Sequence, residues 1–398
     1  MIRAGAPGVR IVATVLMGWE LGGGLGHVSV LVDVARRLAE HGHEPVLAVK
    51  DLVGPLALLK GVPFPVLQAP LWTGDLIPGF RASSYADILA ARGFDDPDGL
   101  GMVVSAWQRL IDLTGAAGVV VDAAPALELA AYRALPVVSV ENGFHSPPVE
   151  GWAFPVLDPA AWPIASPERL LAVVREVQRR RGRAAPESLP ALFGGARRFV
   201  HTYPELDPCR AVRREPAAGP LHRLAAPVPS PGGASYFAYL AADYPGVDLL
   251  LPHLAAAGFR GAAYIRNASP ALVETARTVG VEVHDSPPPW DEVLPRAAVV
   301  IHHASLGAAE GALAAGRPHV LLPRHLEHEL TAQALEDLGV GVALKGRLTV
   351  QDVEGAVRRA LTGPAYTDRA MALARTLRER APGESLTRIT ECCLSLLP

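Results

Sequence analysis

The chain has 398 residues, of which half are hydrophobic and 19% are charged, and its formal net charge is −3. This length and apolar content suffice for about two domains of ordinary size. The small net charge gives no overall field that could hold DNA or a lipid surface, so we expect no nucleic-acid partner. The cysteines, Cys209, Cys392 and Cys393, form neither a disulfide framework nor a metal knuckle, which favours a reducing, cytoplasmic setting.

The first segment predicts a strand, a tight loop and a helix. Residues 10–19 form an apolar run that a glycine cluster follows, so we interpret it as a buried strand and not as a signal peptide. Glycines at 22–26 indicate the loop, and the apolar period over 30–39 predicts the helix. His41-Gly42-His43 ends that helix and residues 45–49 predict the next strand, which completes a βαβ unit. No apolar run approaches the about 20 residues of a membrane span.

The same alternation returns further along the chain. Residues 118–122 and 136–140 predict strands on either side of a helix at 126–135, which extends one parallel sheet. Between these units, residues 70–101 are irregular and contain scattered aromatic side chains. Loops at the carboxyl edge of a parallel sheet hold ligands, so we expect this stretch to line a binding site.

A proline-dense stretch, residues 202–233, disfavours helix interiors and central strands and predicts an interdomain linker. We assign domains to residues 1–205 and 234–380, a linker to 206–233 and a final helix to 381–398. After the linker the alternation resumes, with strands predicted at 235–240, 262–265, 281–284, 298–302 and 319–322 and helices at 247–257, 270–279, 308–315, 333–338 and 353–361. The predicted fold class is α/β, with two doubly wound, Rossmann-like domains facing across a cleft.

His27 and Asp122 are candidate catalytic residues. His27 stands where a dinucleotide-binding fingerprint requires its third glycine, so that motif fails. A histidine at this sheet edge suits a general base, although it could equally fill space beside the glycines. Asp122 ends a strand at the same edge, where it could orient the imidazole or instead cap the following helix.

The segment 300–344 carries the most specific pattern. His302 is followed at eight residues by Glu310, then by Ala312-Leu313, by Gly316 with Pro318, and by Pro323 with Glu327-His328. This pattern resembles the donor-binding motif of the UDP-glycosyltransferase superfamily, including the bacterial macrolide-type and plant secondary-metabolite enzymes. The Gly-His-Val at 26–28 is similar to an N-terminal element of that family.

The resemblance implies a GT-B architecture, with an N-terminal acceptor domain, a C-terminal nucleotide-sugar domain and a final helix that packs back on the first domain. The helix after His302 would present its amides to a diphosphate. Glu310 would bind the ribose hydroxyls, although it could also be a solvated helix charge. The residues expected to bind the donor are His302, Ser305, Gly307, Glu310, Glu327, His328 and Trp290.

Several positions depart from the family pattern. His303 and Ala304 replace glycines, and Leu306-Gly307 replaces Gly-Thr, so a phosphate-facing hydroxyl is lost that Ser305 could supply. Trp290 replaces a glutamine and either stacks on the base or packs in the protein. Asp243 stands near the expected diphosphate and would repel it, so we expect its carboxylate to point elsewhere.

The resemblance implies an inverting transfer of a sugar from UDP or dTDP to a small hydrophobic acceptor, without a cofactor. The segment 325–328 lacks the spacing of a helical zinc motif, so we expect no metal. The acceptor residues we expect are Trp72, Phe80, Phe144 and His145. A non-catalytic binding relative, a lipid-linked N-acetylglucosamine transferase and an epimerase remain alternatives, and a homodimer is left open.

Overall fold

The computed structural model describes residues 12–74, 80–222, 224–346, 348–380 and 385–397. Its internal contacts divide the chain into two compact units. The N-terminal unit comprises the described parts of Met1–His201, Val212–Pro216 and Ser385–Pro398, and the C-terminal unit those of Thr202–Ala211 and Ala217–Glu384. The stretch assigned to the linker is therefore shared between both units. No described helix has the length and hydropathy needed to span a membrane.

The N-terminal unit is built on a parallel sheet with the order β3-β2-β1-β4-β5-β6. Its strands are β1 (Thr14–Trp19), β2 (Glu44–Val49), β3 (Val66–Gln68), β4 (Gly118–Asp122), β5 (Val137–Glu141) and β6 (Arg197–Val200). Its α-helices are α1 (Gly26–Glu40), α2 (Leu56–Leu59), α3 (Tyr85–Leu89), α4 (Pro97–Thr114), α5 (Pro125–Ala131), α6 (Pro167–Arg180), α7 (Leu189–Leu192) and α15 (Ser385–Leu396), and a π-helical turn, η1, covers Ala90–Phe94. This strand order is that of the doubly wound nucleotide-binding folds.

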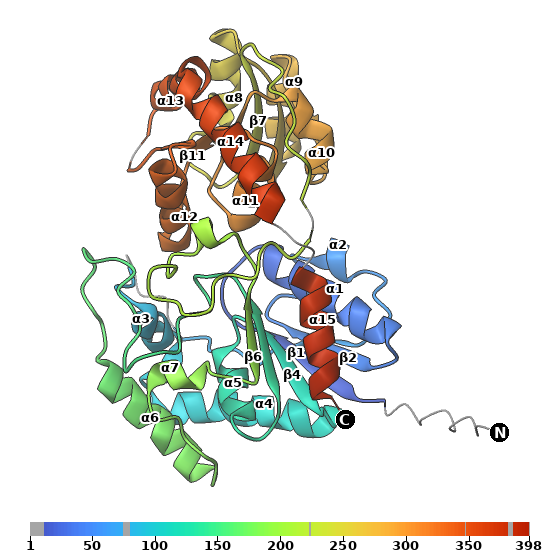
Figure 1. The fold of residues 1–398 in the computed structure, drawn as a ribbon, viewed down its shortest axis with the longest axis vertical. Coiled ribbons are helices and arrows are strands. Elements are labelled where there is room, and N and C mark those ends of the chain that lie inside the picture. Colours follow the sequence, from blue (N-terminus) through green and yellow to red (C-terminus); the bar gives the residue numbers. More distant parts are fainter. Residues whose placement is uncertain (1–11, 75–79, 223, 347, 381–384, 398) are drawn as a thin grey trace, which may run out of the picture. The chain divides into compact units, whose positions relative to one another are not determined.

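The central strands β1, β4 and β5 are buried almost throughout, because helices cover both faces of the sheet. On one face, α4 and α5 approach β1 closely at Gly18, where an added Cβ would lie 2.3 Å from Leu127 and 3.2 Å from Trp107. On the other face, α1 packs on the sheet and α15 lies beside α1 (Figure 1). The buried face of α15 includes Leu386 and Ile389.

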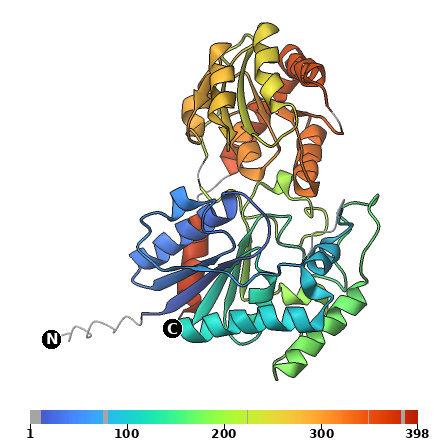
Figure 2. The ribbon, with the colours of Figure 1, turned by 180° about the vertical axis from the view of Figure 1, so that it is seen from behind.

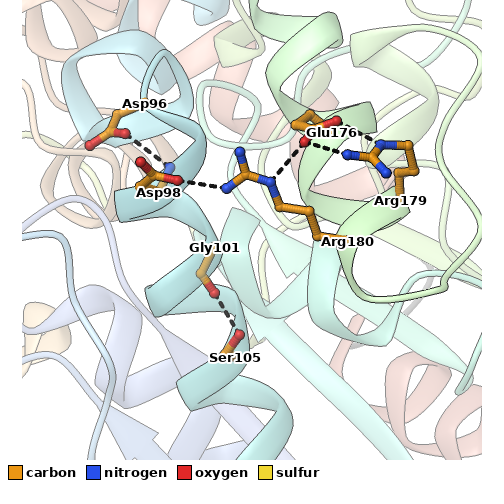
Figure 3. Close-up of polar contacts among 7 residues, drawn as sticks. All are labelled: Asp96, Asp98, Gly101, Ser105, Glu176, Arg179 and Arg180. Atoms are coloured by element: carbon orange, nitrogen blue, oxygen red, sulfur yellow. Dashed lines mark hydrogen bonds and ion pairs between the residues drawn. The ribbon is translucent and has the colours of Figure 1, made fainter.

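Helices α4 and α6 pack together on the first of these faces (Figure 2). Asp96 caps α4 by accepting the N–H of Asp98 at 3.0 Å. Arg180 of α6 donates to the carboxylate of Asp98 at 2.6 Å and to Glu176 at 2.8 Å (Figure 3). These ion pairs are exposed, so they contribute little to the stability of the unit.

The C-terminal unit has a second parallel sheet with the order β12-β11-β10-β7-β8-β9. Its strands are β7 (Ser235–Ala241), β8 (Arg260–Arg266), β9 (Glu282–His284), β10 (Val299–His302), β11 (His319–Leu321) and β12 (Gly341–Ala343). Its helices are α8 (Val247–Ala256), α9 (Pro270–Thr278), α10 (Trp290–Val293), α11 (Leu306–Ala314), α12 (Leu326–Asp337), α13 (Val350–Thr362) and α14 (Pro364–Arg380), with 3-10 turns η2 (Pro204–Leu206) and η3 (Leu294–Arg296).

The predicted α/β class and the doubly wound sheets are confirmed. The predicted strand at 118–122 coincides with β4, whereas α5 ends at Ala131 and not at residue 135. The stretch 70–101, predicted to be irregular, contains α3, η1 and the first turn of α4. Helix α12 begins at Leu326, seven residues before the predicted start, so Glu327 and His328 lie in its first turn.

Candidate active site

A histidine and an aspartate meet at the carboxyl edge of the N-terminal sheet. The pairing of β1 with β4 places Trp19 opposite Asp122, and His27 lies in the first turn of α1. His27 Nδ1 lies 2.9 Å from Asp122 Oδ1, and both side chains are buried. Because a carboxylate can only accept, Nδ1 carries the proton and Nε2 is left as the basic atom. From the sequence we expected these two residues at the same edge of the sheet, and the structure shows that they also form a hydrogen bond.

The charge of Asp122 is stabilised by its neighbours. Burial alone would raise its pKa, but the charge and hydrogen bond of His27, with His201 and His145, lower the pKa below its ordinary value. Asp122 is therefore ionised at neutral pH and can stabilise an imidazolium on His27.

Two aromatic side chains and a glycine fix the position of the imidazole. The His27 ring stacks on Trp19 with a centroid separation of 5.4 Å and meets the edge of His145 at 5.1 Å. Gly22 has a φ of +76°, and a Cβ on it would lie 2.3 Å from His27 Nε2. Glycine adopts this backbone conformation without strain, and it has no side chain that would collide with the basic atom.

The peptide that follows Asp122 is held on both sides. Ala123 has a φ of +51°, which is unusual for a residue with a side chain. Its N–H donates to Glu141 Oε1 at 2.8 Å, and its carbonyl accepts from Leu21 N at 2.8 Å and Glu20 N at 3.2 Å. These bonds maintain the strained turn and, with it, the position of the Asp122 carboxyl.

Glu20 has the capping role that was an alternative for Asp122. Its carboxyl accepts the N–H groups of Ala126 and Leu127 at the start of α5, at 3.1 and 2.8 Å. Burial raises the pKa of Glu20 to about 8, although these N–H bonds lower it in part. Burial and the charge of Asp122 likewise raise the pKa of Glu141 to about 7, while Arg198 lowers it. Neither glutamate was predicted from the sequence.

In the C-terminal unit, His302 ends β10 as predicted, but its ring is fully buried. His302 Nδ1 accepts the N–H of Ala304 at 3.1 Å, so Nε2 carries the proton and donates to His319 Nδ1 at 2.9 Å. Burial lowers the pKa of His302 well below its ordinary value. In this structure His302 shapes the turn into α11 through the backbone N–H of Ala304.

The residues that replace the family's glycines have structural roles here. His303 Nδ1 donates to the carbonyl of Leu322 at 2.9 Å, while Nε2 accepts the N–H of Ala241 at 3.0 Å. The ring thus links the ends of β11 and β7. Ala304 has a φ of +63°, the left-handed conformation that glycine adopts without strain. An alanine therefore retains the turn geometry for which the family pattern has glycine.

Ser305 and Gly307 lie at the start of α11. Ser305 is the N-cap residue, but its hydroxyl makes no capping hydrogen bond. Gly307 is exposed, and a Cβ there would meet nothing within 4 Å. The hydroxyl and the first amides of this nine-residue helix are thus available to an anion.

Glu310 lies further along α11, within the C-terminal unit, and is buried. Burial raises its pKa to about 8, and the side chain of Thr202 and the backbone of Tyr203 lower it in part. Its Oε1 atom has no hydrogen-bond partner in the described part of the chain. The alternative of a solvated surface charge is therefore wrong, because this carboxyl is buried. Its Oε1 atom can still accept a hydrogen bond from a ligand.

Trp290 packs within the C-terminal unit. Its ring stacks on Tyr239 with centroids 5.6 Å apart and meets Phe237 edge to face at 5.8 Å. Gly311 of α11 makes room for it, since a Cβ there would lie 2.9 Å from the indole. The residue is half-buried, so packing covers most of its surface and leaves part of the ring accessible.

The remaining predicted donor residues lie in the first turn of α12. Glu327 and His328 are both half-buried. The ring centroids of His328 and His325 lie 3.8 Å apart. Burial, together with the charge of His325, lowers the pKa of His328 to about 2. Asp243 forms an ion pair with Arg324 at 2.6 Å. This pairing offsets the repulsion that Asp243 would exert on a diphosphate.

The predicted acceptor residues are scattered through the N-terminal unit. His145 contacts His27, and Phe144 meets His145 edge to face at 5.1 Å. Trp72 lines a small cavity beside Glu20, whereas Phe80 is exposed and is not among the residues of that cavity. Among the described residues, no cluster of histidine, cysteine, aspartate and glutamate side chains has the arrangement of a metal site.

Comparison with known proteins gives the family. Residues 275–392 match the family model described as "Erythromycin biosynthesis protein CIII-like, C-terminal domain". This part of the chain belongs to the UDP-glycosyltransferase superfamily. The superfamily was predicted from the motif that contains His302 and Glu310, and that prediction is confirmed.

Curated relatives match the chain over short segments. Glycosyltransferase GtfC of Amycolatopsis orientalis is 40% identical over 83 residues, which is 21% of this chain and 20% of that protein. Vancomycin aglycone glucosyltransferase of the same organism is 40% identical over 84 residues, again 21% and 20%. A sterol 3-beta-glucosyltransferase of Vanderwaltozyma polyspora is 29% identical over 109 residues, 27% of this chain and 9% of that protein. The matched segments span a fifth or less of these relatives.

Solved structures match nearly the whole chain. The glycotransferase of kitacinnamycin has a TM-score of 0.65 at 18% identity and covers 97% of this chain and 100% of its own. Spinosyn rhamnosyltransferase SpnG has a TM-score of 0.64 at 17% identity, with 96% and 100% covered. The glycosyltransferase VinC, solved in complex with dTDP, has a TM-score of 0.63 at 16% identity, with 95% and 100% covered. The chain therefore has the predicted GT-B fold.

Proposed function

We propose that this protein is an inverting glycosyltransferase that moves a sugar from a UDP or dTDP donor to a hydroxyl of a small natural product. The observation that carries the proposal is the 2.9 Å hydrogen bond between His27 Nδ1 and Asp122 Oδ1, which leaves Nε2 as the base. The names of the relatives support the reaction class. A binding-only relative has no need of this buried ionised pair.

In the proposed reaction, His27 Nε2 takes the proton of the acceptor hydroxyl as the oxygen attacks the anomeric carbon. The bond from that carbon to the diphosphate breaks with inversion, and Asp122 stabilises the imidazolium that forms. A positioned base contributes about 10²–10⁴-fold to such a rate.

The leaving diphosphate binds at the start of α11 in this proposal. Ser305 and the first amides of the helix supply donors, and Glu310 accepts from the ribose hydroxyls. Trp290, Glu327 and His328 contact the base and sugar. The donors at α11 replace a metal, so we propose that no cofactor is required. We also propose a cytoplasmic location, which agrees with the free thiols of Cys392 and Cys393.

The test is to incubate the full chain with UDP- and dTDP-sugars and a panel of hydroxylated apolar acceptors, and to detect products by mass spectrometry. Nuclear magnetic resonance of the product then gives the anomeric configuration. A β-product from an α-configured donor, formed equally well in the presence of a chelator, supports the proposal. Retention of configuration, or transfer that the chelator abolishes, would contradict it.

A further inference from the structure

A small cavity lies at the carboxyl edge of the N-terminal sheet, with a volume of about 70 Å³. Residues that follow β1, β2 and β4 contribute to it, and its polar side chains are Glu20, Lys50 and Arg92. One water needs about 10–15 Å³ of such volume. The cavity therefore has room for one functional group of a ligand and not for a whole natural product.

The aromatic wall of this cavity depends on glycines. Trp72 lines the cavity, and a Cβ on Gly99 or Gly93 would lie 2.1 or 2.5 Å from its indole. Gly93 also has a φ of +83°, which side chains rarely adopt. The absence of a side chain at Gly93 and Gly99 therefore leaves the space that the Trp72 indole fills.

Arg92 reaches the cavity from a break in the helix. It lies in the π-helical turn η1, where Arg92 and Gly93 have non-helical backbone angles. Its guanidinium has five N–H donors, yet within the described ranges it makes no side-chain hydrogen bond or ion pair. The donors of Arg92 are therefore available to a ligand.

Lys50 is the second cation. Its Nζ donates to the carbonyl of Gly22 at 2.6 Å and lies 5.7 Å from the ring centroid of Trp19. An ammonium has three donors, so this bond leaves others unused. Burial and the charge of Arg92 lower the pKa of Lys50, while the charge of Asp51 raises it in part. The two cations are thus close enough to repel each other.

No carboxylate in the cavity wall balances these cations. Glu20 is the acidic lining residue, but its carboxyl accepts the amides of α5, and burial raises its pKa to about 8. It is therefore mostly neutral at pH 7. The nearby Asp51 accepts the N–H groups of Val53 and Gly54 and does not line the cavity. Two partly desolvated cations that share a cavity with apolar walls favour an anionic ligand.

We propose that the cavity receives the anionic end of the acceptor, an apolar molecule bearing a carboxylate, through Lys50 and Arg92. This inference rests on the proposed transferase function. The site is connected to the base, because the Gly22 carbonyl that Lys50 binds belongs to the residue bordering His27 Nε2. An acceptor anchored at the cations would extend from the cavity toward His27 with its hydroxyl.

The test is direct binding to the full chain by calorimetry, without any donor. The probes are 4-hydroxyphenylacetate and 3-cyclohexylpropanoate, each compared with its amide. We expect each acid to bind at least about tenfold more tightly than its amide. Arg92→Met and Lys50→Met should each remove most of that preference, and Arg92→Lys should retain part of it. Arg169→Met, at an exposed position on α6, is the matched control.

Equal binding of acid and amide, or a preference that survives both methionine variants, overturns the inference. Absence of acid binding overturns it as well. Thermal unfolding of each variant checks that the N-terminal unit is folded. Since calorimetry involves no sugar transfer, these outcomes leave the proposed function standing. Conversely, acid binding without any transferase activity would overturn the proposed function alone.

Discussion

Glu141 Oε1 accepts the backbone N–H of Ala123 at 2.8 Å, one residue beyond Asp122. A side chain at the end of β5 thus holds the turn that follows β4. The same turn is held from β1 by the backbone N–H groups of Glu20 and Leu21. The position of the Asp122 carboxyl, and with it the orientation of His27, depends on bonds from two neighbouring strands.

The first prediction concerns Glu141. Glu141→Ala leaves the buried N–H of Ala123 without an acceptor, which costs about 1–3 kcal/mol of stability. We expect kcat to fall while the KM for the donor stays near its original value, because the proposed donor-binding residues lie in the other unit. Glu141→Gln retains an acceptor oxygen and should recover most of both losses. Steady-state kinetics and chemical unfolding of the two variants check this, and equal damage in both would contradict it.

The second prediction concerns the glycines before α1. A Cβ at Gly22 would collide with His27 Nε2 and would require an unfavourable φ of +76°. Gly22→Ala should therefore reduce sugar transfer strongly and destabilise the fold by about 1–2 kcal/mol. Gly23→Ala is the matched control, because a Cβ there meets nothing within 4 Å. Similar transfer rates for the two variants would show that space at Nε2 is unimportant.

The third prediction concerns pH and Glu20. Its folded pKa of about 8 lies above its ordinary 4.5. The folded state therefore binds the proton more tightly, and the resulting stability is complete below pH 4.5 and is lost as pH rises through 8. We expect the free energy of unfolding to decline between pH 5 and 9, and to decline less in Glu20→Gln.

The control for this pH series is Glu176→Gln. The hydrogen bonds of Arg179 and Arg180 lower the pKa of Glu176 to about 2, so any stability it contributes is lost below pH 4.5 and does not change between pH 5 and 9. This variant should show the slope of the parent protein. An unchanged slope in Glu20→Gln would mean that Glu20 is ionised in the folded state.

The fourth prediction concerns the donor site. Ser305 does not cap α11, so Ser305→Ala should weaken nucleotide diphosphate binding by about tenfold without lowering stability. Ser269 does cap α9 by accepting the N–H of Leu272 at 3.2 Å. Ser269→Ala should instead cost about 1 kcal/mol of stability and leave nucleotide affinity unchanged. Calorimetry with UDP and dTDP, paired with thermal unfolding, separates the two, and unaltered affinity in Ser305→Ala would remove this residue from the donor site.

The sequence predicted that His27 and Asp122 would lie close together, because parallel strands bring their carboxyl ends to one edge. The run before Asp122 and the Gly-His-Val at 26–28 each have a local signature, and the fold class supplies their proximity. The donor motif was recognised from the spacing of His302 and Glu310, which is a local pattern as well.

Other features had no local signature. Glu141 and Glu20 act on the backbone of a remote turn, and no pattern in the sequence tells which buried amide a glutamate will meet. Lys50 and Arg92 lie in segments whose only signal is polarity, and their meeting depends on the break in the helix at η1. The role of His303 was likewise hidden, because it joins strand ends that are far apart in sequence.

The most direct test of His27 as the base is to measure sugar transfer by His27→Ala and nucleotide binding to the same variant. If Nε2 of His27 takes the acceptor proton, transfer should fall by about 10²–10⁴-fold while the affinity for the nucleotide diphosphate stays unchanged. Transfer at the parental rate in this variant would contradict the assignment of the base and the mechanism built on it.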